Sequence, residues 1–580
     1  MKYMCLILGI LVSLLFSRDF DEGPYGTGYY DTAAPFTVYD LNVQMVGDVN
    51  IDQQINILDA LTIVQAIAGI IELSAEQFTI ADINNDGILD VVDIVSMVNL
   101  ALNPQPSTWV FQNEWNGNDS YIFIHYSQSV GNSPALWISD TKHQLLQNSP
   151  DNVHYFFISD RASSQEDVQE IKSEFDEIIS TLSNEEKAHW LSHLHYIPTK
   201  TSELETWLSE ALLDKYALGI DTFQKLKQIG YLGNPNGFTG THMSYLAHEA
   251  HYYNYEQSEF SVSADDYLEV TIFDSVLYNG GWASTIQTIV EIPSDEILSN
   301  TEKMEIELFR PCADYLDGGC DDYDRTARLW VCDEDESNCN EIARWITPFD
   351  RQPHHLTDIT PFISKLRPGG NKYFKFQISG WPNNIVFMNL RLYQNENIEQ
   401  TPQEIIPLWN GGGFYSNGEP VYNENIEPQV FEIPENATKV EFVTYITGHG
   451  SGCDSDNCAE FCNTRHFFSV NGGVFEFDKS HPEAGAAADC MSVESIANGV
   501  IPNQYGTWGY GRAGWCPGLD VDPFIQDITD YVEFGDANVL EYNMCWASQN
   551  NVCHDGWPTI TNPGGYLAEI VMSSYIIIYY

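Results

Sequence analysis

Acidic and amide side chains recur at matching positions in a duplicated segment near the N-terminus. The stretch GDVNIDQQINILD, Gly47 to Asp59, returns 34 residues later as ADINNDGILDVVD, Ala81 to Asp93. Each copy places oxygen-bearing side chains at positions 1, 3, 5, 9 and 12 of a loop, with a main-chain carbonyl at position 7. Ca²⁺ takes about six to eight oxygen ligands, so the repeat predicts two calcium sites. The predicted ligands are Asp48, Asn50, Asp52, Gln54, Asn56 and Asp59 in the first copy, and Asp82, Asn84, Asp86, Ile88, Asp90 and Asp93 in the second.

Each loop is followed by apolar residues at helical spacing, so we expect two helices that pack face to face. The two stripes are Leu58, Leu61, Ile63, Val64 and Ile67, then Val92, Ile94, Val95, Val98 and Leu100. This duplicated unit of loop and helix resembles a dockerin domain over residues 46–104. The resemblance implies a cohesin-like protein partner, and a calcium-stabilised spacer is the alternative. In the first loop Gln53 replaces the turn glycine that the second loop has as Gly87, which predicts weaker binding at the first site.

Cysteines cluster in the second half of the chain. Cys5 lies near the N-terminus, and the other eleven of the twelve fall between Cys312 and Cys553. Clustered cysteines in an exported chain predict disulfides rather than free thiols, and CAEFC lacks the second ligand pair of a zinc finger. Their spacing suggests the pairs Cys312–Cys320, Cys332–Cys339, Cys458–Cys462, Cys490–Cys516 and Cys545–Cys553. Cys453 is left over and competes with Cys458 and Cys462 for a partner.

Export is predicted by residues 1–17, where Lys2 precedes a short apolar run that ends before Arg18, as in a secretory signal peptide. Residues 18–45 are expected to form a linker, and no later stretch predicts a membrane span. The chain has 25 Lys and Arg against 83 Asp and Glu, a formal net charge of -58. Such a charge repels phosphates, so nucleic acid is a poor candidate partner. We expect a secreted protein, or an extracellular one associated with a surface.

Residues 105–258 carry a mixed pattern of strands and helices. Strand-like runs at Tyr121–Tyr126 and Val153–Ser159 precede a run of apolar residues at helical spacing from Val168 to Leu182. The order suggests an α/β accessory domain with a thioredoxin-like or similar fold. No cysteine lies in it, so thiol redox chemistry is excluded.

Two groups of histidines in this segment could suggest a metal site. His189, His193 and His195 lie close together, and the HEAH segment spans His248 to His251. Neither matches HExxH, and HEAH offers no identifiable third ligand. Both groups therefore predict solvated helix faces, and we assign the segment no chemistry.

Beyond residue 258 the pattern changes to short alternating strands separated by turns rich in Gly, Pro and Asn. Examples are Lys303–Phe309, Thr326–Val331 and Lys439–Thr447. The pattern predicts two adjacent jelly-roll β-sandwiches, at 259–400 and 401–580. The whole chain is thus expected to be multidomain and mainly β, with the α/β domain and a small all-α calcium module ahead of the sandwiches.

Three segments of the sandwich region resemble the peptide-N-glycosidase F family of glycan amidases. They are CDDYDRTARLWV at Cys320 to Val331 with EIARWITPF close behind it, NCAEFCNTRH at Asn457 to His466, and GRAGWCPG at Gly511 to Gly518. Their order and spacing agree with the family over roughly the last 320 residues. The resemblance implies a pair of jelly rolls and hydrolysis of the amide bond between the core GlcNAc of an N-glycan and asparagine, which leaves aspartate.

The resemblance also implies roles for individual residues. Asp324 and Glu460 correspond to the catalytic carboxylates, and the chemistry needs one group to activate water and another to manage the proton of the leaving nitrogen. The substrate-binding positions are Arg512, Arg325, Trp381, Trp515, Ser379 and His449. No cofactor is implied for catalysis, the expected substrates are N-glycosylated proteins or glycopeptides, and Ca²⁺ is expected only as a structural ion.

Two departures from the family pattern leave alternatives open. Ser379 stands where the family has a further active-site glutamate, and His449 lies in a loop where the family has a tryptophan. A non-catalytic glycan-binding protein tethered by the dockerin-like module is therefore the second hypothesis. A copper monooxygenase on related sandwiches is the third, but only His354 and His355 form a suggestive ligand pair.

Overall fold

The computed structural model describes most of the chain in two compact units. The described residues are 18–42, 47–50, 55–84, 86–102, 108–237, 239–281, 284–311, 320–378, 383–413, 415–416, 419–452, 454, 456–547, 553, 561–562 and 568–580. The first unit holds the chain through Ile229 and Thr241–Tyr253, and the second holds Gly230–Gly240 and Asn254–Tyr580. Among the described residues, no helix combines the length and apolar character needed to cross a bilayer.

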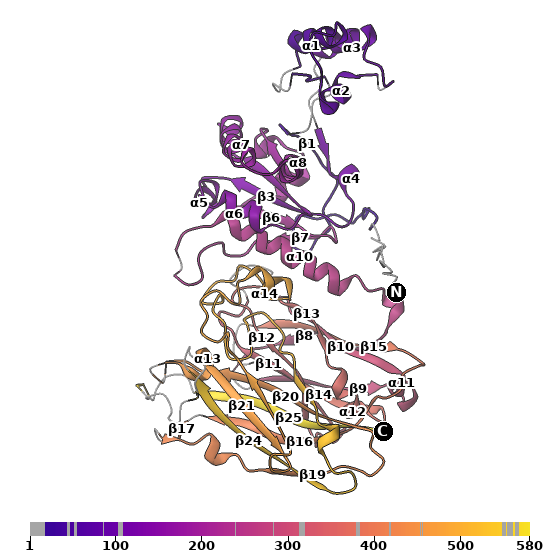
Figure 1. The fold of residues 1–580 in the computed structure, drawn as a ribbon, viewed down its shortest axis with the longest axis vertical. Helices are drawn as coiled ribbons and strands as arrows, with labels where there is room; N and C mark the ends of the chain where they lie inside the picture. The colour runs from indigo at the N-terminus through magenta and orange to yellow at the C-terminus, as the bar shows by residue number, and fades with distance from the viewer. Residues whose placement is uncertain are drawn as a thin grey trace, which may run out of the picture. The chain divides into compact units, whose positions relative to one another are not determined.

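Three helices form the calcium module of the first unit. They are α1 (Ile57–Ile67), α2 (Ala75–Ala81) and α3 (Val91–Leu102), of which α1 and α3 lie side by side (Figure 1). Asn56 caps α1, because its side chain accepts a hydrogen bond from the Leu58 amide. Ile63 and Met97 form the core of the module together with smaller residues.

The expected packing of the two apolar stripes is wrong for most of their members. Ile63 is buried as predicted, but the structure leaves the side chains of Leu58, Leu61, Val64, Ile67, Val92 and Val95 exposed. A module this small has room for few core positions, so α1 and α3 meet along a narrow line of contact. The remaining apolar positions leave exposed side chains along one side of α1 and near both ends of α3.

A mixed five-stranded sheet forms the centre of the α/β domain. Its order is β5-β4-β3-β6-β7, with β3, β4 and β5 parallel and β6 and β7 antiparallel. The strands are β3 (Ser120–Tyr126), β4 (Val153–Ser159), β5 (Leu194–Ile197), β6 (Ala217–Ile220) and β7 (Leu226–Gln228). The helices are α4 (Phe111–Glu114), α5 (Ser133–Trp137), α6 (Lys142–Asn148), α7 (Ser164–Ser180), α8 (Asn184–His193), α9 (Thr206–Ala211) and α10 (Leu246–Phe260). The parallel strands are buried almost throughout, as expected when helices cover both faces of a sheet.

The linker predicted for residues 18–45 is wrong over its described part, 18–42. Strand β1 (Thr37–Tyr39) pairs with β2 (Thr108–Val110), and Phe36 and Val38 pack into the core of the α/β domain. Apolar side chains at alternating positions here lie against the sheet, so the segment is structural. The calcium module is therefore inserted between two paired strands.

Two of the grouped histidines of the first unit are buried, contrary to the sequence interpretation, whereas His189, His193 and His251 remain partly exposed on their helices. His195 is buried on β5, because the chain passes from α8 directly into this edge strand, which is buried along its whole length. His248 and Glu249 are buried on α10. The Nε2 atom of His251 lies 2.8 Å from the carbonyl of Asn148, which explains that residue without a metal.

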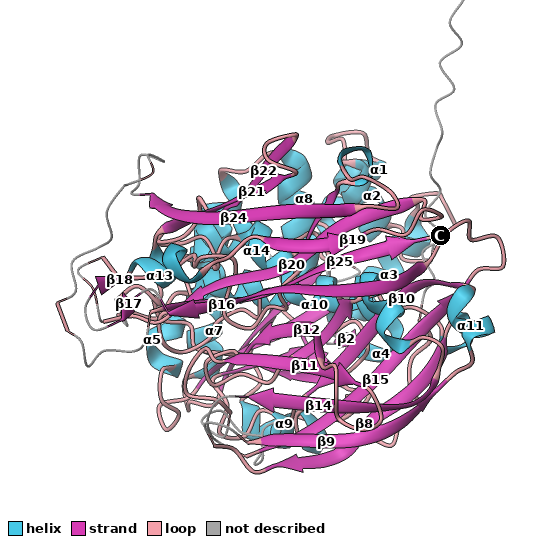
Figure 2. Cartoon of the chain, turned by 90° about the horizontal axis from the view of Figure 1, so that it is seen from below, coloured by secondary structure: helices cyan, strands magenta, loops and turns pink. Residues whose placement is uncertain are grey.

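Both predicted jelly rolls are present in the second unit. When the strands of each sandwich are numbered 1 to 8 in chain order, each has one sheet ordered 1-8-3-6 and one ordered 2-7-4-5. Figure 2 shows the strands of both sandwiches running in one general direction. The first comprises β8 (Leu268–Tyr278), β9 (Thr285–Ile292), β10 (Thr301–Phe309), β11 (Thr326–Cys332), β12 (Asn340–Ile346), β13 (His354–Asp358), β14 (Gly370–Ile378) and β15 (Asn384–Gln394).

The second sandwich is longer in sequence than the first. It comprises β16 (Pro402–Gly413), β19 (Gln429–Glu432), β20 (Lys439–His449), β21 (Asn463–Val470), β22 (Phe475–Ser480), β23 (Phe524–Asp527), β24 (Ala537–Ala547) and β25 (Glu569–Tyr579), with a small ribbon of β17 (Tyr415–Ser416) and β18 (Glu419–Pro420). Short helices α11 (Asp295–Ser299), α12 (Ile363–Leu366), α13 (Cys458–Phe461) and α14 (Val493–Ala497) connect strands of the unit. Apolar residues of β20 and β25 join the core of the first sandwich, so this core extends across the junction to the second sandwich, which also has a separate core of its own.

A buried ion pair reinforces this junction. Arg344 on β12 binds both carboxylate oxygens of Glu341, at 2.7 and 3.0 Å. Its Nη1 also donates to Thr447 on β20 and to the carbonyl of Val571 on β25. Both charged side chains are almost fully buried, so the guanidinium connects strands of the two sandwiches through satisfied hydrogen bonds.

Four disulfides are present in the described part of the second unit. They join Cys332 to Cys339, Cys458 to Cys462, Cys490 to Cys516, and Cys545 to Cys553. Cys320 is also disulfide-bonded, whereas its expected partner Cys312 and the left-over Cys453 lie outside the described residues.

Replacing Arg344 with leucine should lower the stability of the second unit by about 3–5 kcal/mol, because the buried Glu341 would keep only the more distant Arg328 and the Ser573 hydroxyl as partners. The double variant Glu341→Leu/Arg344→Leu should lose less, since it removes the buried carboxylate together with its main partner. Urea unfolding of the full chain measures both. Equal losses in the two variants would show that the ion pair does not determine the stability of the junction.

Candidate active site

Glu460 lies on the one-turn helix α13, which begins immediately after Asn457. Asn457 has a φ of 53°, and its carbonyl accepts hydrogen bonds from the Glu460 and Phe461 amides. The disulfide between Cys458 and Cys462 closes this turn. The Glu460 carbonyl accepts the Ala513 amide at 2.8 Å, which ties α13 to the segment that carries Arg512. Covalent and hydrogen-bonded constraints therefore restrict the position of the carboxylate.

Asp324 lies just before β11 of the first sandwich. The residues on either side of it are held by Thr347, whose hydroxyl donates to the Tyr323 carbonyl and accepts from the Arg325 amide. The Thr347 amide in turn donates to the Arg325 carbonyl at 2.8 Å. Three hydrogen bonds to one buried threonine thus fix the main chain that bears this carboxylate.

Arg512 brings the two carboxylates together. Its Nη2 lies 2.9 Å from Asp324 Oδ2, and its Nε lies 3.4 Å from Glu460 Oε1. The arginine side chain is 1% exposed, whereas those of Asp324 and Glu460 are 16% and 13% exposed. Within the described residues, neither Asp324 Oδ2 nor Arg512 Nε has a partner aligned for a hydrogen bond. The contacts of Arg512 with Asp324 and with Glu460 are therefore ion pairs. The sequence predicted these residues from separate segments, and the structure places both carboxylates in contact with Arg512.

Burial and neighbouring charges set the pKa values of the two carboxylates. Burial raises the pKa of Glu460 to about 7, an effect that the negative charge of Asp324 increases and Arg512 opposes. Burial also raises the pKa of Asp324, and the neighbouring Arg512 charge acts against it. The pair can therefore hold one proton near neutral pH, an arrangement that provides an acid and a base in one site.

The segment carrying Arg512 is supported from several sides. The guanidinium Nη1 donates to the Tyr510 carbonyl at 2.6 Å, and the disulfide from Cys490 to Cys516 fixes the segment beyond it. Gly448 on β20 packs against the Ala459 carbonyl so closely that any Cβ would collide with it. Glycine at this position allows β20, α13 and the Arg512 segment to meet.

The predicted substrate-binding residues Trp515 and His449 contact each other. The His449 ring stacks on Trp515 with centroids 4.9 Å apart, and the indole Nε1 donates to the Gly448 carbonyl. Trp515 is 6% exposed and belongs to the core of the second unit, so the indole offers little surface to a sugar. Burial and the charges of nearby arginines lower the pKa of His449 to about 3, so its imidazole is neutral. The Trp515 ring lies beside the Arg512 guanidinium, and His449 packs against Trp515.

The remaining predicted positions differ in how far the structure describes them. The Arg325 guanidinium lies 5.4 Å from the ring centre of Tyr323. Ser379 and Trp381 lie outside the described residues. The roles assigned to all these side chains stay predictions.

Two aromatic residues near the carboxylates were not selected from the sequence. Tyr323 precedes Asp324 and is 56% exposed, and Phe461 follows Glu460 with its ring 5.4 Å from the Arg512 guanidinium. Exposed aromatic faces bind the apolar faces of sugars, so Tyr323 is the better placed of the two. Each of these aromatic residues is next in sequence to a predicted catalytic residue, and this adjacency could have identified them from the sequence.

The described residues predicted to bind calcium lie in two loops, where their carboxylates accept hydrogen bonds from main-chain amides of the same loop. In the second loop Asp82 accepts the Asp86 and Gly87 amides, Asp86 accepts the Ile88 amide, and Asp93 accepts the Ile83 and Asp90 amides. In the first loop Asp59 accepts the Asn50 and Asn56 amides. Asp52 and Gln54 lie outside the described residues.

These residues fit a bound cation. Asp59 and Asp93 are fully buried, and Asp48 and Asp82 are nearly so. Residues 46–102 contain no lysine, arginine or histidine, so the sequence of the module provides no cationic side chain to balance these carboxylates. A buried carboxylate without a countercharge is costly, and Ca²⁺ is the ion whose ligand preference matches the donor set.

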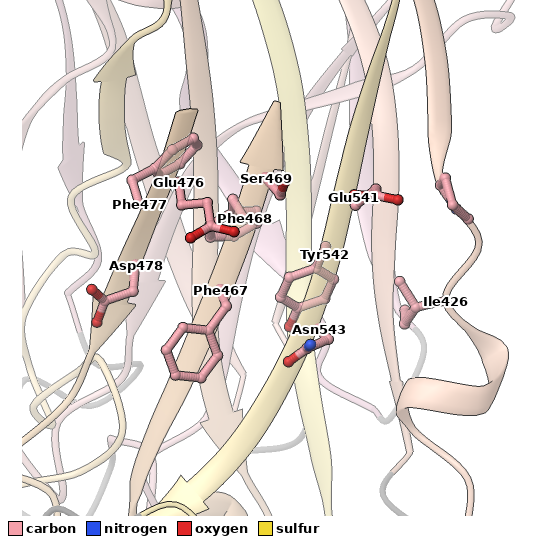
Figure 3. Close-up of a pocket in the computed structure, with 11 residues that line it drawn as sticks. Ile426, Phe467, Phe468, Ser469, Glu476, Phe477, Asp478, Glu541, Tyr542 and Asn543 are labelled. Atoms are coloured by element: carbon pink, nitrogen blue, oxygen red, sulfur yellow. The ribbon is translucent and has the colours of Figure 1, made fainter. Parts of the chain in front are cut away.

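A separate hollow of about 620 Å³ lies on the outer part of the second sandwich (Figure 3). Phe467, Asp478, Glu541 and Asn543 are among its lining residues, on strands β21, β22 and β24. It shares no residue with the candidate site at Asp324 and Glu460.

Glu460→Gln should change how stability depends on pH. The carboxyl pKa of Glu460 is about 7 in the folded protein against 4.5 for the unfolded chain, so the folded state keeps a proton that the unfolded state loses. Stability that this proton provides is complete below pH 4.5 and is lost as pH rises to about 7. The variant should gain on the order of 2–3 kcal/mol relative to the natural protein between pH 4.5 and 8. Thermal unfolding at both pH values measures it.

Glu435→Gln is the matched control, because Glu435 is an exposed glutamate of the same sandwich. Its stability should follow that of the natural protein at both pH values. Identical pH dependence for Glu460→Gln and Glu435→Gln would contradict the raised pKa.

Comparison with known proteins adds independent evidence. Residues 419–577 match the family described as peptide-N-glycosidase F, C-terminal, and residues 46–102 match the dockerin type I domain. The amidase F from Elizabethkingia miricola, a peptide-N(4)-(N-acetyl-beta-D-glucosaminyl)asparagine amidase, is 25% identical over 319 residues, which span 52% of this chain and 83% of that protein.

Solved structures give related matches. PNGase F, a glycosylasparaginase from Flavobacterium meningosepticum, aligns over 54% of this chain and 96% of its own, with 21% identity and a TM-score of 0.39. The PNGF-II structure aligns over 63% of this chain and 73% of its own, with 13% identity and a TM-score of 0.39. The two resemblances predicted from the sequence are confirmed by the domain matches: the chain carries a peptide-N-glycosidase F C-terminal domain and a dockerin type I domain.

Proposed function

We propose that this chain is an exported amidase that hydrolyses the bond between asparagine and the core GlcNAc of N-glycans. The observation that carries the proposal is that Asp324 from the first sandwich and Glu460 from the second contact the same buried guanidinium of Arg512. The homologous amidase F supports the reaction class. Both carboxylates remain partly exposed, so water and a substrate amide can reach them.

In the proposed reaction, Asp324 is the base that takes a proton from the attacking water. The water oxygen bonds to the side-chain carbonyl carbon of the glycosylated asparagine, and the bond from that carbon to nitrogen then breaks. Glu460 is the acid, because its raised pKa lets it hold a proton at neutral pH and give it to the leaving nitrogen. The nitrogen leaves on the glycan, and aspartate remains in the peptide.

Arg512 has a positioning role in this proposal. Its guanidinium fixes the distance between the two carboxylates and favours the ionised form of Asp324, the closer of the two. Asp324 and Glu460 thereby receive different protonation states in one environment. Tyr323 is placed to contact the sugar next to the reacting amide.

We further propose that the dockerin domain binds Ca²⁺ and docks onto a cohesin-like protein. The exposed apolar side chains of α1 and α3 provide a surface for that contact. Disulfides within the sandwiches fit an oxidising compartment, and together with residues 1–17 they support secretion or attachment at an extracellular surface. The substrate would then be an N-glycosylated protein or glycopeptide outside the cell.

Asp324→Asn and Glu460→Gln should each reduce glycan release by at least about a hundredfold, because each removes one proton-transfer group. The assay is mass spectrometry of a denatured glycopeptide, with free glycan and the change from asparagine to aspartate as readouts. Asp322→Asn is the matched control, since this exposed aspartate lies close to Asp324 in sequence. It should retain full activity.

Hydrolysis in ¹⁸O-water makes the assay specific for the bond that breaks. Attack at the asparagine carbonyl places one ¹⁸O atom in the new aspartate, whereas attack at the sugar places it in the glycan. Glycan binding with no release by the natural chain would contradict the proposal and support the non-catalytic glycan-binding alternative.

Calcium titration of the full chain should show two bound ions, the one at the first loop weaker. Asp59→Asn and Asp93→Asn should each weaken one site by at least about tenfold, because each removes a carboxylate from one loop. Glu72→Gln, an exposed change between the loops, should leave both sites unaltered. Calorimetry measures the stoichiometry, and unchanged binding in both aspartate variants would place calcium elsewhere.

A further inference from the structure

Three side chains from separate parts of the α/β domain converge at one edge of its sheet. Asp119 precedes β3, His154 lies on β4, and His193 ends α8. One possible ligand atom from each lies within 4.8 Å of the others. The Nε2 atom of His154 is 3.3 Å from Asp119 Oδ2, and the His154 and His193 rings stack with centroids 4.3 Å apart.

A chain of hydrogen bonds behind His154 fixes which of its nitrogens is free. Asp40 Oδ2 lies 2.7 Å from His195 Nδ1, so that nitrogen carries a proton donated to the carboxylate. His195 Nε2 lies 2.9 Å from His154 Nδ1 and, in a neutral ring, accepts the proton from it. A neutral His154 then has only a lone pair on Nε2, which faces Asp119 Oδ2.

Two lone pairs that face each other at this distance need a positive charge between or beside them. An additional proton on His154 would supply it, and so would a metal ion. His154 is hydrogen-bonded to the buried His195, which in turn is hydrogen-bonded to the buried Asp40. Histidines bound to metals are oriented in this way, because their second ring nitrogen donates to another protein group. Asn116 donates to Asp119 Oδ2 at 2.6 Å and orients that carboxylate in the same way.

His193 distinguishes between these two explanations. Its Nδ1 lies 2.9 Å from the carbonyl of His189, so this nitrogen carries the proton and Nε2 keeps a lone pair. A second free imidazole nitrogen beside His154 is not required if a proton alone balances Asp119. It is required if a metal ion does.

We propose that Asp119, His154 and His193 form a site for a divalent transition-metal ion of the zinc type. Two imidazole nitrogens and one carboxylate oxygen suit Zn²⁺ and its neighbours, whereas Ca²⁺ selects oxygen ligands only. Ligands of tetrahedral Zn²⁺ at about 2.0 Å lie roughly 3.3 Å from one another. The contact between Asp119 and His154 already has this spacing, at 3.3 Å. For a nitrogen of His193 to reach the same range, its half-exposed ring must turn out of the stack on His154 and shift on its hydrogen bond to the His189 carbonyl.

The site would link the segment before β3, strand β4 and the end of α8 around one ion. It differs from the calcium loops in ligand chemistry, and it lies in a different unit from Asp324 and Glu460. We therefore expect it to stabilise the α/β domain and to have no effect on glycan release. A fourth position remains for water or another ligand.

The test uses the full chain without an affinity tag, stripped of metal and then kept in excess Ca²⁺ so that the dockerin loops are filled. Titration with Co²⁺ should give visible absorption bands that saturate at one ion, and one equivalent of Zn²⁺ should abolish them. Zn²⁺ should also raise the unfolding temperature of the chain.

Asp119→Asn and His193→Asn should weaken Co²⁺ binding by at least about tenfold. These two residues are partly exposed, so the variants are expected to fold, and far-ultraviolet circular dichroism checks this. His143→Asn on α6 is the matched control and should bind as the natural chain does. Absence of saturable Co²⁺ binding, or binding that persists in both ligand variants, would overturn the proposal and leave a protonated histidine chain as the explanation.

Discussion

The buried guanidinium of Arg512 is the constraint on which the candidate active site depends. It lies between carboxylates from two different sandwiches, and one positive charge faces two acidic groups that burial alone would keep protonated. Because there are two carboxyl groups and one guanidinium, one carboxylate can ionise beside Arg512 while the other keeps a proton. The site can therefore offer a base and an acid. A rigid frame must hold such a group, since an unpaired buried charge is strongly unfavourable.

That frame is the junction of the two jelly rolls. Apolar residues of β20 and β25 pack into the core of the first sandwich, and Arg344 adds hydrogen bonds from β12 to β20 and β25. Segments beyond Arg512 also pair with β12, as when the Val521 amide donates to the Arg344 carbonyl. The same interface therefore stabilises the second unit and sets the distance between its two candidate catalytic groups.

The first unit shows a different relation between sequence and architecture. The dockerin domain is inserted between β1 and β2, which pair with each other, so its two connections leave from adjacent points of the α/β domain. Asp40, just after β1, contacts the buried His195 on β5, the edge strand of the sheet. Residues that seemed to be a linker thus complete both the core and the histidine cluster.

The sequence by itself determined features whose residues lie close together along the chain. The predicted calcium ligands fall within two short loops, and Cys458 with Cys462, four residues apart, could pair in only a few ways. Alternating apolar residues also sufficed to predict two sandwiches. Only the tertiary structure decided which distant groups meet: Asp324 with Glu460 at Arg512, and Asp119 with His154 and His193. It also decided which apolar helix positions stay exposed. Local patterns constrain neighbouring residues, whereas burial and pairing between distant segments depend on how complete sheets and helices pack.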